Sequence, residues 1–255
     1  MTMQIDIALW DRFVDELAAR PVCPLFVTVS GAHLYGFPSP DSDVDLRGCH
    51  QLPLREVVGL IPPEQTFQWT GVHRQVEVDL VSHEIGKYFA LLVKNNGYIL
   101  EQIFSPLVVR GQAFLDELRP IARRCITKFH YHHYRGFYAS QRKLLDKQPR
   151  KGAKQVLYAY RVLLTGIHLL ETGDVEANLR VLNQQYRVPG IDELIASKTE
   201  EKIAPEMDWE QHADQLQQLE SQLDESFAHS PLPEDRDTTA VHQLLVDLRL
   251  ESRQC

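Results

Sequence analysis

The chain has 255 residues, of which 44% are hydrophobic and 24% charged, and its formal net charge is −8; this is the composition of a globular protein with one large core or two modest ones. No apolar run approaches the roughly 20 residues of a membrane-spanning helix, and the N-terminus lacks the basic and apolar regions of a signal peptide. The four cysteines, at positions 23, 49, 125 and 255, lie far apart and form no Cys-x-x-Cys pair, so we expect a reduced, cytoplasmic protein without a cysteine-based zinc site.

The first 110 residues alternate between helix and strand patterns. Apolar residues at helical spacing are followed by the apolar run Leu25–Val29, which is typical of a buried strand. The stretch from Gly31 to Phe37 predicts a turn that opens into a short helix, and Asn96-Gly97 predicts the end of a helix. In chain order we expect a helix over 5–19, strands over 25–29, 43–49, 66–69 and 75–81, a turn at 71–73, and helices over 83–95 and 98–104.

Nearly everything after about residue 111 has a helical pattern. The expected helices cover roughly 112–127, 128–147, 151–172, 174–186, 190–199, 208–228 and 238–250. The segment 230–237, with two prolines and three acidic residues, predicts an exposed linker. We therefore expect an α/β (α+β) fold, with an α/β domain over 1–110 and a helical domain over 111–255.

Three carboxylates occur at positions where neighbouring strands would bring them together. Asp43 and Asp45 alternate along one strand and so face one way, about 7 Å apart. On the later strand, Asp79 or Glu77 supplies a third carboxylate. Two Mg²⁺ ions that promote phosphoryl or nucleotidyl transfer need such carboxylates, because the metals neutralise charge on the attacked phosphate and on the leaving pyrophosphate. Arg47 shares the face of Asp43 and Asp45, where it either holds a phosphate or offsets the acidic charge.

The basic residues are concentrated in one part of the chain. From Arg119 to Arg161 there are twelve of the 27 Lys or Arg residues and one of the 35 acidic residues, Asp146. Either these are solvated helix faces, or the segment binds a nucleic acid, because aromatic rings stack on bases while Lys and Arg contact phosphates. The aromatic residues between the cations are Phe129, Tyr131, Tyr134, Phe137 and Tyr138.

The run from Gly31 to Gly36, followed by Ser42-Asp43-Val44-Asp45-Leu46-Arg47-Gly48, resembles the signature of the DNA polymerase beta nucleotidyltransferase superfamily. Within it, the chain is most similar to the branch of predicted nucleotidyltransferases that includes RNA-repair-associated polymerases. That branch has a lysine-bearing helix after its third carboxylate, then an Asn-rich stretch; here these correspond to Lys87 and to residues 94–101. The resemblance touches roughly residues 25–170 and implies a mixed sheet in the first domain.

The resemblance also implies roles for particular residues. Asp43, Asp45 and Asp79 would bind Mg²⁺, with two ions expected and Mn²⁺ as an alternative, and Asp79 would help to activate the incoming hydroxyl. The Gly31 turn would hold the β and γ phosphates of an NTP. The implied nucleotide-binding residues are Gly31, Ala32, Tyr35, Gly36, Arg47, Lys87, Lys154, Tyr158 and Arg161. The last three share a helical face and are either a phosphate-and-base clamp or a core tyrosine between solvated charges.

One position departs from the family pattern. The family usually has a serine directly after the glycine, where its hydroxyl meets phosphate, and this chain has Ala32. We expect a Mg²⁺-dependent nucleotidyltransferase that acts on a hydroxyl, with an RNA 3′ end as the favoured acceptor and no membrane partner. The alternatives are a transferase that modifies a protein hydroxyl, a non-catalytic nucleotide- or RNA-binding module on the same fold, and a metal-dependent phosphohydrolase.

Overall fold

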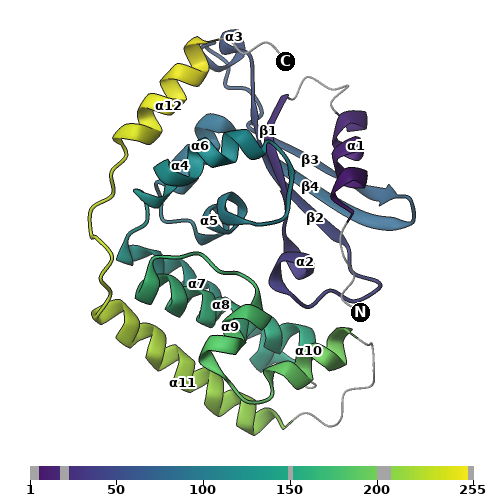
Figure 1. The fold of residues 1–255 in the computed structure, drawn as a ribbon, viewed down its shortest axis with the longest axis vertical. Coiled ribbons are helices and arrows are strands. Elements are labelled where there is room, and N and C mark those ends of the chain that lie inside the picture. Colours follow the sequence, from purple (N-terminus) through teal and green to yellow (C-terminus); the bar gives the residue numbers. More distant parts are fainter. Residues whose placement is uncertain (1–5, 18–22, 149–151, 200–207, 252–255) are drawn as a thin grey trace. The chain divides into compact units, whose positions relative to one another are not determined.

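The computed structural model describes residues 6–17, 23–148, 152–199 and 208–251 (Figure 1). The chain forms two compact units. The sheet unit contains residues up to Gly31, residues 43–125 and the chain from Arg236 onward. The helical unit contains residues 32–42 and 126–235. Each unit is described by itself below.

The sheet unit is built on five strands in the order β3-β4-β2-β1-β5. Strands β2 and β4 are parallel, whereas the other neighbours are antiparallel, so the sheet is mixed, as expected for an α/β fold. Its elements are α1 (Ile7–Leu17), β1 (Cys23–Val29), β2 (Val44–Gln51), α3 (Leu54–Val57), β3 (Thr66–His73), β4 (Val76–Glu84), α4 (Ile85–Leu92), α5 (Gly97–Phe104), β5 (Val108–Arg110), α6 (Gln112–Arg123) and α12 (Thr239–Leu250).

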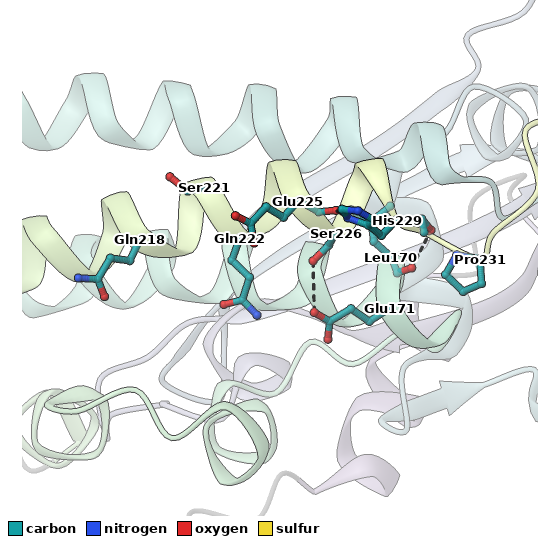
Figure 2. Close-up of a pocket in the computed structure, with 10 residues that line it drawn as sticks. Leu170, Glu171, Gln218, Ser221, Gln222, Glu225, Ser226, His229 and Pro231 are labelled. Carbon is teal, nitrogen blue, oxygen red and sulfur yellow. Dashed lines mark hydrogen bonds between the residues drawn. The ribbon is translucent and has the colours of Figure 1, made fainter.

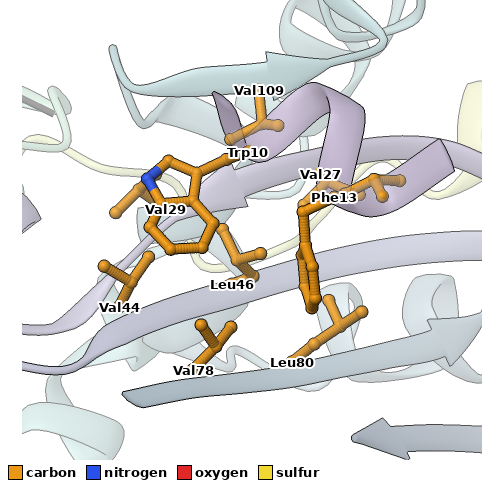
Figure 3. Close-up of a cluster of buried hydrophobic side chains, with 10 residues drawn as sticks. Trp10, Phe13, Val27, Val29, Val44, Leu46, Val78, Leu80 and Val109 are labelled. Atoms are coloured by element: carbon orange, nitrogen blue, oxygen red, sulfur yellow. The ribbon is translucent and has the colours of Figure 1, made fainter. Parts of the chain in front are cut away.

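Helix α1 packs on one face of this sheet. Trp10 and Phe13 lie over the strands in a cluster of buried apolar side chains (Figure 3). The strand residues in this cluster alternate along β2 and β4, as a two-sided strand requires. They are Val27, Val29, Val44, Leu46, Val78, Leu80 and Val109. Because these side chains occupy one face, the intervening polar residues of β2 and β4 are left for the other.

The helical unit is organised around α8 (Ala153–Thr172), along which most side chains are buried. The short helix α2 (Gly31–Tyr35) begins at the last residue that belongs to the sheet unit. The other elements of the helical unit are η1 (Lys128–His130), α7 (Tyr131–Lys147), α9 (Leu179–Tyr186), α10 (Ile191–Thr199) and α11 (Trp209–Ala228). Within the described residues, no helix has both the length and the apolar character needed to cross a membrane.

Several sequence-based boundaries are corrected by the structure. The turn between β3 and β4 lies at Arg74-Gln75, both with positive φ, and not at 71–73. Asn96 begins α5 as its N-cap, accepting a hydrogen bond from Tyr98 N at 3.0 Å, and does not end the preceding helix. Strand β5 has only three residues and was not predicted, and α9 starts at Leu179 and not at 174. Residues 5, 18–19 and 151 of the expected helices lie outside the described residues.

The contacts also group α6 and α12 with the sheet, although both follow residue 110 in sequence. The boundary at residue 110 remains a prediction about domains. The division by contacts differs from it, because each of its two units is made of separate stretches of the chain. The segment 230–237, predicted to be a linker, contains the point at 235–236 where the chain leaves the helical unit.

Candidate active site

Asp45 and Asp79 occupy directly paired positions on the parallel strands β2 and β4. Both lie on the sheet face opposite the α1 core, because the adjacent Leu46 and Leu80 are part of that core. Like charges at paired positions repel each other, so this arrangement needs a cation nearby. The pairing of the two strands is the condition on which the predicted carboxylate site depended.

Arg47 supplies that cation. Its Nη2 donates to Asp45 Oδ1 at 2.7 Å and to Asp79 Oδ2 at 2.9 Å. Its Nη1 donates to the main-chain oxygens of Leu46 at 2.9 Å and Asp79 at 2.8 Å. Four acceptors therefore fix the planar guanidinium between the strands. Arg47 thus contacts both acidic residues, and its contact with a phosphate remains a prediction.

Asp45 is the carboxylate most affected by its surroundings. Burial raises the pKa of Asp45 above its ordinary value, and the charge of Arg47 opposes this rise. The carboxylates of Asp43 and Asp79 raise the pKa of Asp45 further. Asp43 is exposed and lies immediately before β2. Glu77, the alternative third carboxylate, is also exposed.

Gly31 lies directly against the side chain of Asp45. Its φ is +62°, and a Cβ built on it would lie 1.9 Å from Asp45 Oδ2, so any side chain would collide with the carboxylate. Ser30 N donates to the main-chain oxygen of Asp45 at 2.8 Å, which ties the end of β1 to β2. The glycine of the signature is therefore explained by its approach to the carboxylate. Ala32, at the position of the family serine, is buried.

The donor set suits a hard divalent cation. Oxygen atoms from Asp45 and Asp79 converge on one cationic nitrogen, at 2.7 and 2.9 Å, so this position already favours positive charge. Carboxylate oxygens are the protein ligands that Mg²⁺ prefers. No group of three or more His, Cys, Asp or Glu side chains is arranged to hold a metal in the described part of the chain. The residues fit a cation at Asp45 and Asp79, with Asp43 adjacent.

Three residues that the sequence did not single out, Thr66, Thr70 and His83, also lie on this face of the sheet. Thr70 Oγ1 donates to Asp79 Oδ1 at 3.1 Å, from the neighbouring strand β3. Lys87 Nζ donates to Thr66 Oγ1, and this hydroxyl lies 3.2 Å from His83 Nδ1. Burial, and then the charges of Lys87 and Arg47, lowers the pKa of His83. The pairing of β3 with β4 brings these groups together, and the sequence pattern of a single strand does not predict which residues pair.

A second set of predicted residues lies in the helical unit. The guanidinium of Arg161, a side chain that is almost fully buried, lies 3.9 Å from the centre of the Tyr35 ring. Tyr158 packs edge-on against Tyr35 and Phe37, with ring centres 5.7 and 5.6 Å apart. Lys154, one turn earlier on α8, is exposed. The three α8 residues therefore differ in environment, from a buried Arg161 to an exposed Lys154.

The loop after α2 is held by residues of α9 and α10. Gly36 has a φ of +86°, and its carbonyl oxygen accepts from Arg180 Nε at 2.6 Å. A Cβ on Gly36 would meet the side chain of Asn178 at 2.2 Å. Lys198 Nζ donates to Ser39 Oγ farther along the loop. Arg180, Asn178 and Lys198 were not predicted, because they lie more than 130 residues from the loop in sequence.

Many cations of the basic segment are engaged in ion pairs. Arg135 pairs with Glu220 at 2.5 Å and with Asp224 at 3.3 Å, both on α11. Lys128 pairs with Glu234 at 2.5 Å. Other pairs are Arg119–Asp116, Arg124–Asp237 and Arg142–Asp146. Tyr134 and Tyr138 are buried, so they belong to the core and present no stacking surface. The fold thus neutralises part of the charge on which the nucleic-acid interpretation depended.

An open groove of about 680 Å³ lies elsewhere in the helical unit, along α11 and the end of α8 (Figure 2). Ser226 Oγ donates to Glu171 Oε1 at 3.2 Å, and Tyr186 donates to the other oxygen of Glu171 at 2.9 Å. The lining residues are Leu170, Glu171, Gln218, Ser221, Gln222, Glu225, Ser226, His229, Ser230 and Pro231. None of the predicted site residues lines this groove.

The match to a family model agrees with the sequence signature. Residues 9–247 match the sequence model of RlaP, described as the RNA repair pathway DNA polymerase beta family. The chain is 31% identical over 220 residues to an uncharacterized protein, MJ0002, from Methanocaldococcus jannaschii, which covers 85% of this chain and 90% of the relative. It is also similar to the crystal structure of a nucleotidyltransferase-like protein from Exiguobacterium sibiricum 255-15, with 11% identity, a TM-score of 0.35, and coverage of 98% of this chain and 81% of the other.

Proposed function

The chain belongs to the RNA repair pathway DNA polymerase beta family, and on this premise we propose that it is a Mg²⁺-dependent nucleotidyltransferase. In the proposed reaction a hydroxyl oxygen of the acceptor bonds to the α-phosphorus of an NTP. The bond from that phosphorus to the β-phosphate oxygen breaks, and pyrophosphate leaves. The observation that supports this proposal most is the pair of carboxylates, Asp45 and Asp79, at facing positions of two parallel strands.

In this proposal Asp43, Asp45 and Asp79 hold two divalent ions, Mg²⁺ or alternatively Mn²⁺. The ions, when bound, would neutralise charge on the attacked phosphate and on pyrophosphate. Asp79 accepts the proton of the acceptor hydroxyl. Thr70 orients the Asp79 carboxylate by donating a hydrogen bond to its Oδ1. Gly31 leaves room for the Asp45 carboxylate, so that it stays oriented toward the β1–α2 turn.

The proposed nucleotide-binding residues fall into two groups, one in each unit. In the sheet unit these are Gly31, Arg47 and Lys87. In the helical unit these are Ala32, Tyr35, Gly36, Lys154, Tyr158 and Arg161. Because Tyr35 and Arg161 are buried, we assign direct contact with the nucleotide to the exposed Lys154 and the half-buried Tyr158. Arg161 then supports Tyr35, whose ring centre lies 3.9 Å from its guanidinium, and Tyr35 in turn packs against Tyr158.

The favoured acceptor is an RNA 3′ end. The description of the family supports this choice, and the surface charge of the basic segment does not. We place the reaction in the cytoplasm, where buried thiols such as Cys49 and Cys125 stay reduced. The runner-up within the same chemistry transfers the nucleotide to a protein hydroxyl. A non-catalytic nucleotide- or RNA-binding module is favoured by one observation, the replacement of the phosphate-binding serine by Ala32.

The test is transfer of label from an α-labelled NTP, with Mg²⁺, to RNA with a free 3′ hydroxyl. Asp45→Asn and Asp43→Asn are expected to lower the rate by about 100-fold or more, because each removes charge that stabilises the transition state. Glu77→Gln is the matched control, since Glu77 is an exposed carboxylate on the strand of Asp79, and it is expected to retain wild-type transfer.

The products separate the alternatives. RNA with a blocked 3′ end should accept no label, whereas label on the protein itself would favour the protein-modifying enzyme. Pyrophosphate released without any acceptor would identify a hydrolase. Nucleotide binding that survives both carboxylate changes, with no pyrophosphate released, would replace this proposal by the binding module.

A further inference from the structure

Strand β3 is the outermost strand on one side of the sheet, and within the described residues β4 is the one strand that pairs with it (Figure 1). The hydrogen bond from Glu84 N to Gln65 O, at 2.8 Å, shows which main-chain groups of this hairpin face each other. Because such groups alternate along an antiparallel ladder, every second residue of β3 turns its N–H and C=O away from β4. These outward-facing residues are Thr66, Gln68, Thr70 and Val72.

This edge carries no protection against the addition of another strand. Natural proteins protect sheet edges with lysines, prolines, bulges or very short strands. The eight residues of β3, all of them described, include no proline and no Lys, Arg, Asp or Glu, and their register with β4 is continuous. Gln68, Thr70 and Val72 are exposed, Val72 at 66%. The main-chain groups of this edge are therefore accessible to a further strand.

The edge is complementary to a second copy of itself. In an antiparallel copy whose Trp69 faces the Trp69 of the first, Gln68 lies opposite Thr70. In the same register Thr66 lies opposite Val72, so all the outward-facing residues are paired and no like charges meet. The Trp69 side chain is only partly buried by the α1 cluster, and two such rings would meet at the two-fold axis. Cross-strand aromatic pairs stabilise neighbouring strands.

The segment that precedes β3 favours the same pairing. Leu60 and Ile61 are 100% and 83% exposed, which is unusual for large aliphatic side chains side by side. Because Thr66 of one copy faces Val72 of the other, this segment approaches the end of β3 where the partner's exposed Val72 lies. Removal of these apolar side chains from water would favour association.

We propose that β3 is a docking surface for a second copy of the chain, and that two molecules pair antiparallel about a two-fold axis at Trp69. The product is one sheet with five strands from each copy. The inference goes beyond the proposed function and does not depend on it, because it rests on the main chain of β3. The interface adjoins the carboxylate site, since Thr70, which donates to Asp79, lies opposite Gln68 of the second copy.

The experiment is sedimentation of the full chain between about 1 and 500 µM. The wild type is expected to change from monomer to dimer with a Kd on the order of 10 µM, because one pair of strands makes a small interface. Gln68→Pro removes an N–H that faces away from β4, and the two-fold axis repeats the loss, so it should weaken the dimer by about tenfold or more. Gln68→Ala is the matched control. It shortens the side chain but keeps the N–H, and its Kd should stay within about threefold of the wild type.

Hydrogen exchange of the wild-type protein, followed by NMR, needs no variant that has to fold. The amide protons of Gln68, Thr70 and Val72 should exchange about tenfold more slowly at the highest concentration than at the lowest. Those of Phe67 and Gly71, which face β4, should change much less.

Three results would overturn the inference. The first is a protein that stays monomeric over the whole range, which would leave the edge to a different partner. The second is a dimer that Gln68→Pro, shown to be folded by its circular dichroism, does not weaken. The third is a dimer whose β3 amides exchange at the same rate at every concentration, because its interface must then lie elsewhere.

Discussion

The two units use their charged side chains in different ways. In the sheet unit, Arg47 lies between two carboxylates on facing strands, and Arg249 of α12 reaches the buried Glu84 at 2.6 Å. In the helical unit the comparable pairs, such as Arg135 with Glu220, have side chains that are 33% and 28% exposed. One pair of the sheet unit, Arg249 with Glu84, is thus set into its interior, with side chains 15% and 2% exposed, whereas the Arg135 pairs of the helical unit lie half-buried between α7 and α11.

This difference shows which sequence signals are reliable. Alternation along a strand fixes the face on which a residue lies, so it predicted the position of Asp45 and Asp79. The charge of a segment carries no such constraint, because acidic residues from distant parts of the chain approach it in the fold. The basic segment is an example, since residues of α11 and of 234–237 neutralise part of it.

The largest effect is expected for the buried pair. Arg249→Met leaves the Glu84 carboxylate, which is 1% exposed, without this counter-charge, and should lower the free energy of unfolding by about 3–5 kcal/mol. Arg135→Met in the helical unit should cost less than about 1 kcal/mol. Urea denaturation measures both. The double variant Glu84→Gln with Arg249→Met should recover much of the loss; equal losses for the two single variants would remove the contrast between the units.

The next effect concerns two glycines. Gly31→Ala places a methyl group 1.9 Å from Asp45 Oδ2 at a φ of +62°, so it should cost about 2–4 kcal/mol and abolish label transfer. Gly136→Ala is the matched control in α7, where nothing lies within 4 Å of the added Cβ. It should stabilise the protein by about 0.5–1 kcal/mol, since alanine favours a helix interior. Chemical denaturation and the transfer assay test both; wild-type transfer by Gly31→Ala would show that the glycine does not shape the site.

The smallest effect tests a similarity between the units. Burial, and then the charge of His83, lowers the pKa of His50 to about 4. Burial, and then the charges of His130 and Arg161, lowers the pKa of His133 to about 4. The unfolded chain therefore binds a proton at each imidazole more readily than the folded protein does. The free energy of unfolding falls as the pH drops from about 6.5 to 4. Each histidine should cost about 2 kcal/mol by pH 5.

His50→Asn retains a polar atom near Ser82, which lies 2.9 Å from Nδ1 of His50, and removes the titrating group. The acid-induced loss should then shrink by about 2 kcal/mol at pH 5, which is the share of His50. Denaturation curves between pH 7 and 5 measure it. An unaltered profile for His50→Asn would contradict the assignment.

Much of the sheet unit could be predicted from sequence, and less of the helical unit. The strands that carry Asp45 and Asp79 were found because apolar and polar residues alternate. The hairpin turn was misplaced because Arg74 and Gln75 adopt positive φ, which these residue types rarely do. Family membership was recognised from the Gly31 and Asp43-Val44-Asp45 motifs, and the family match confirms it.

What could not be predicted depends on contacts between residues far apart in the chain. The position of Arg47 between two carboxylates follows from the register of β2 against β4, which no single segment encodes. Likewise, Arg180 reaches the Gly36 carbonyl across 144 residues of sequence. The roles assigned to the individual site residues remain predictions that the transfer experiments address.

The division of the chain into two discontinuous units has a consequence for gene fragments and for recombination between relatives. The helical unit is assembled from 32–42 and 126–235, and the sheet unit from the three stretches around them. No single cut therefore yields either unit whole, so a gene fragment that encodes residues 1–125 should give a product that exposes apolar surface and aggregates. Recombination between relatives is expected to keep both units whole only where it exchanges residues 32–42 together with 126–235, or replaces the chain as a whole.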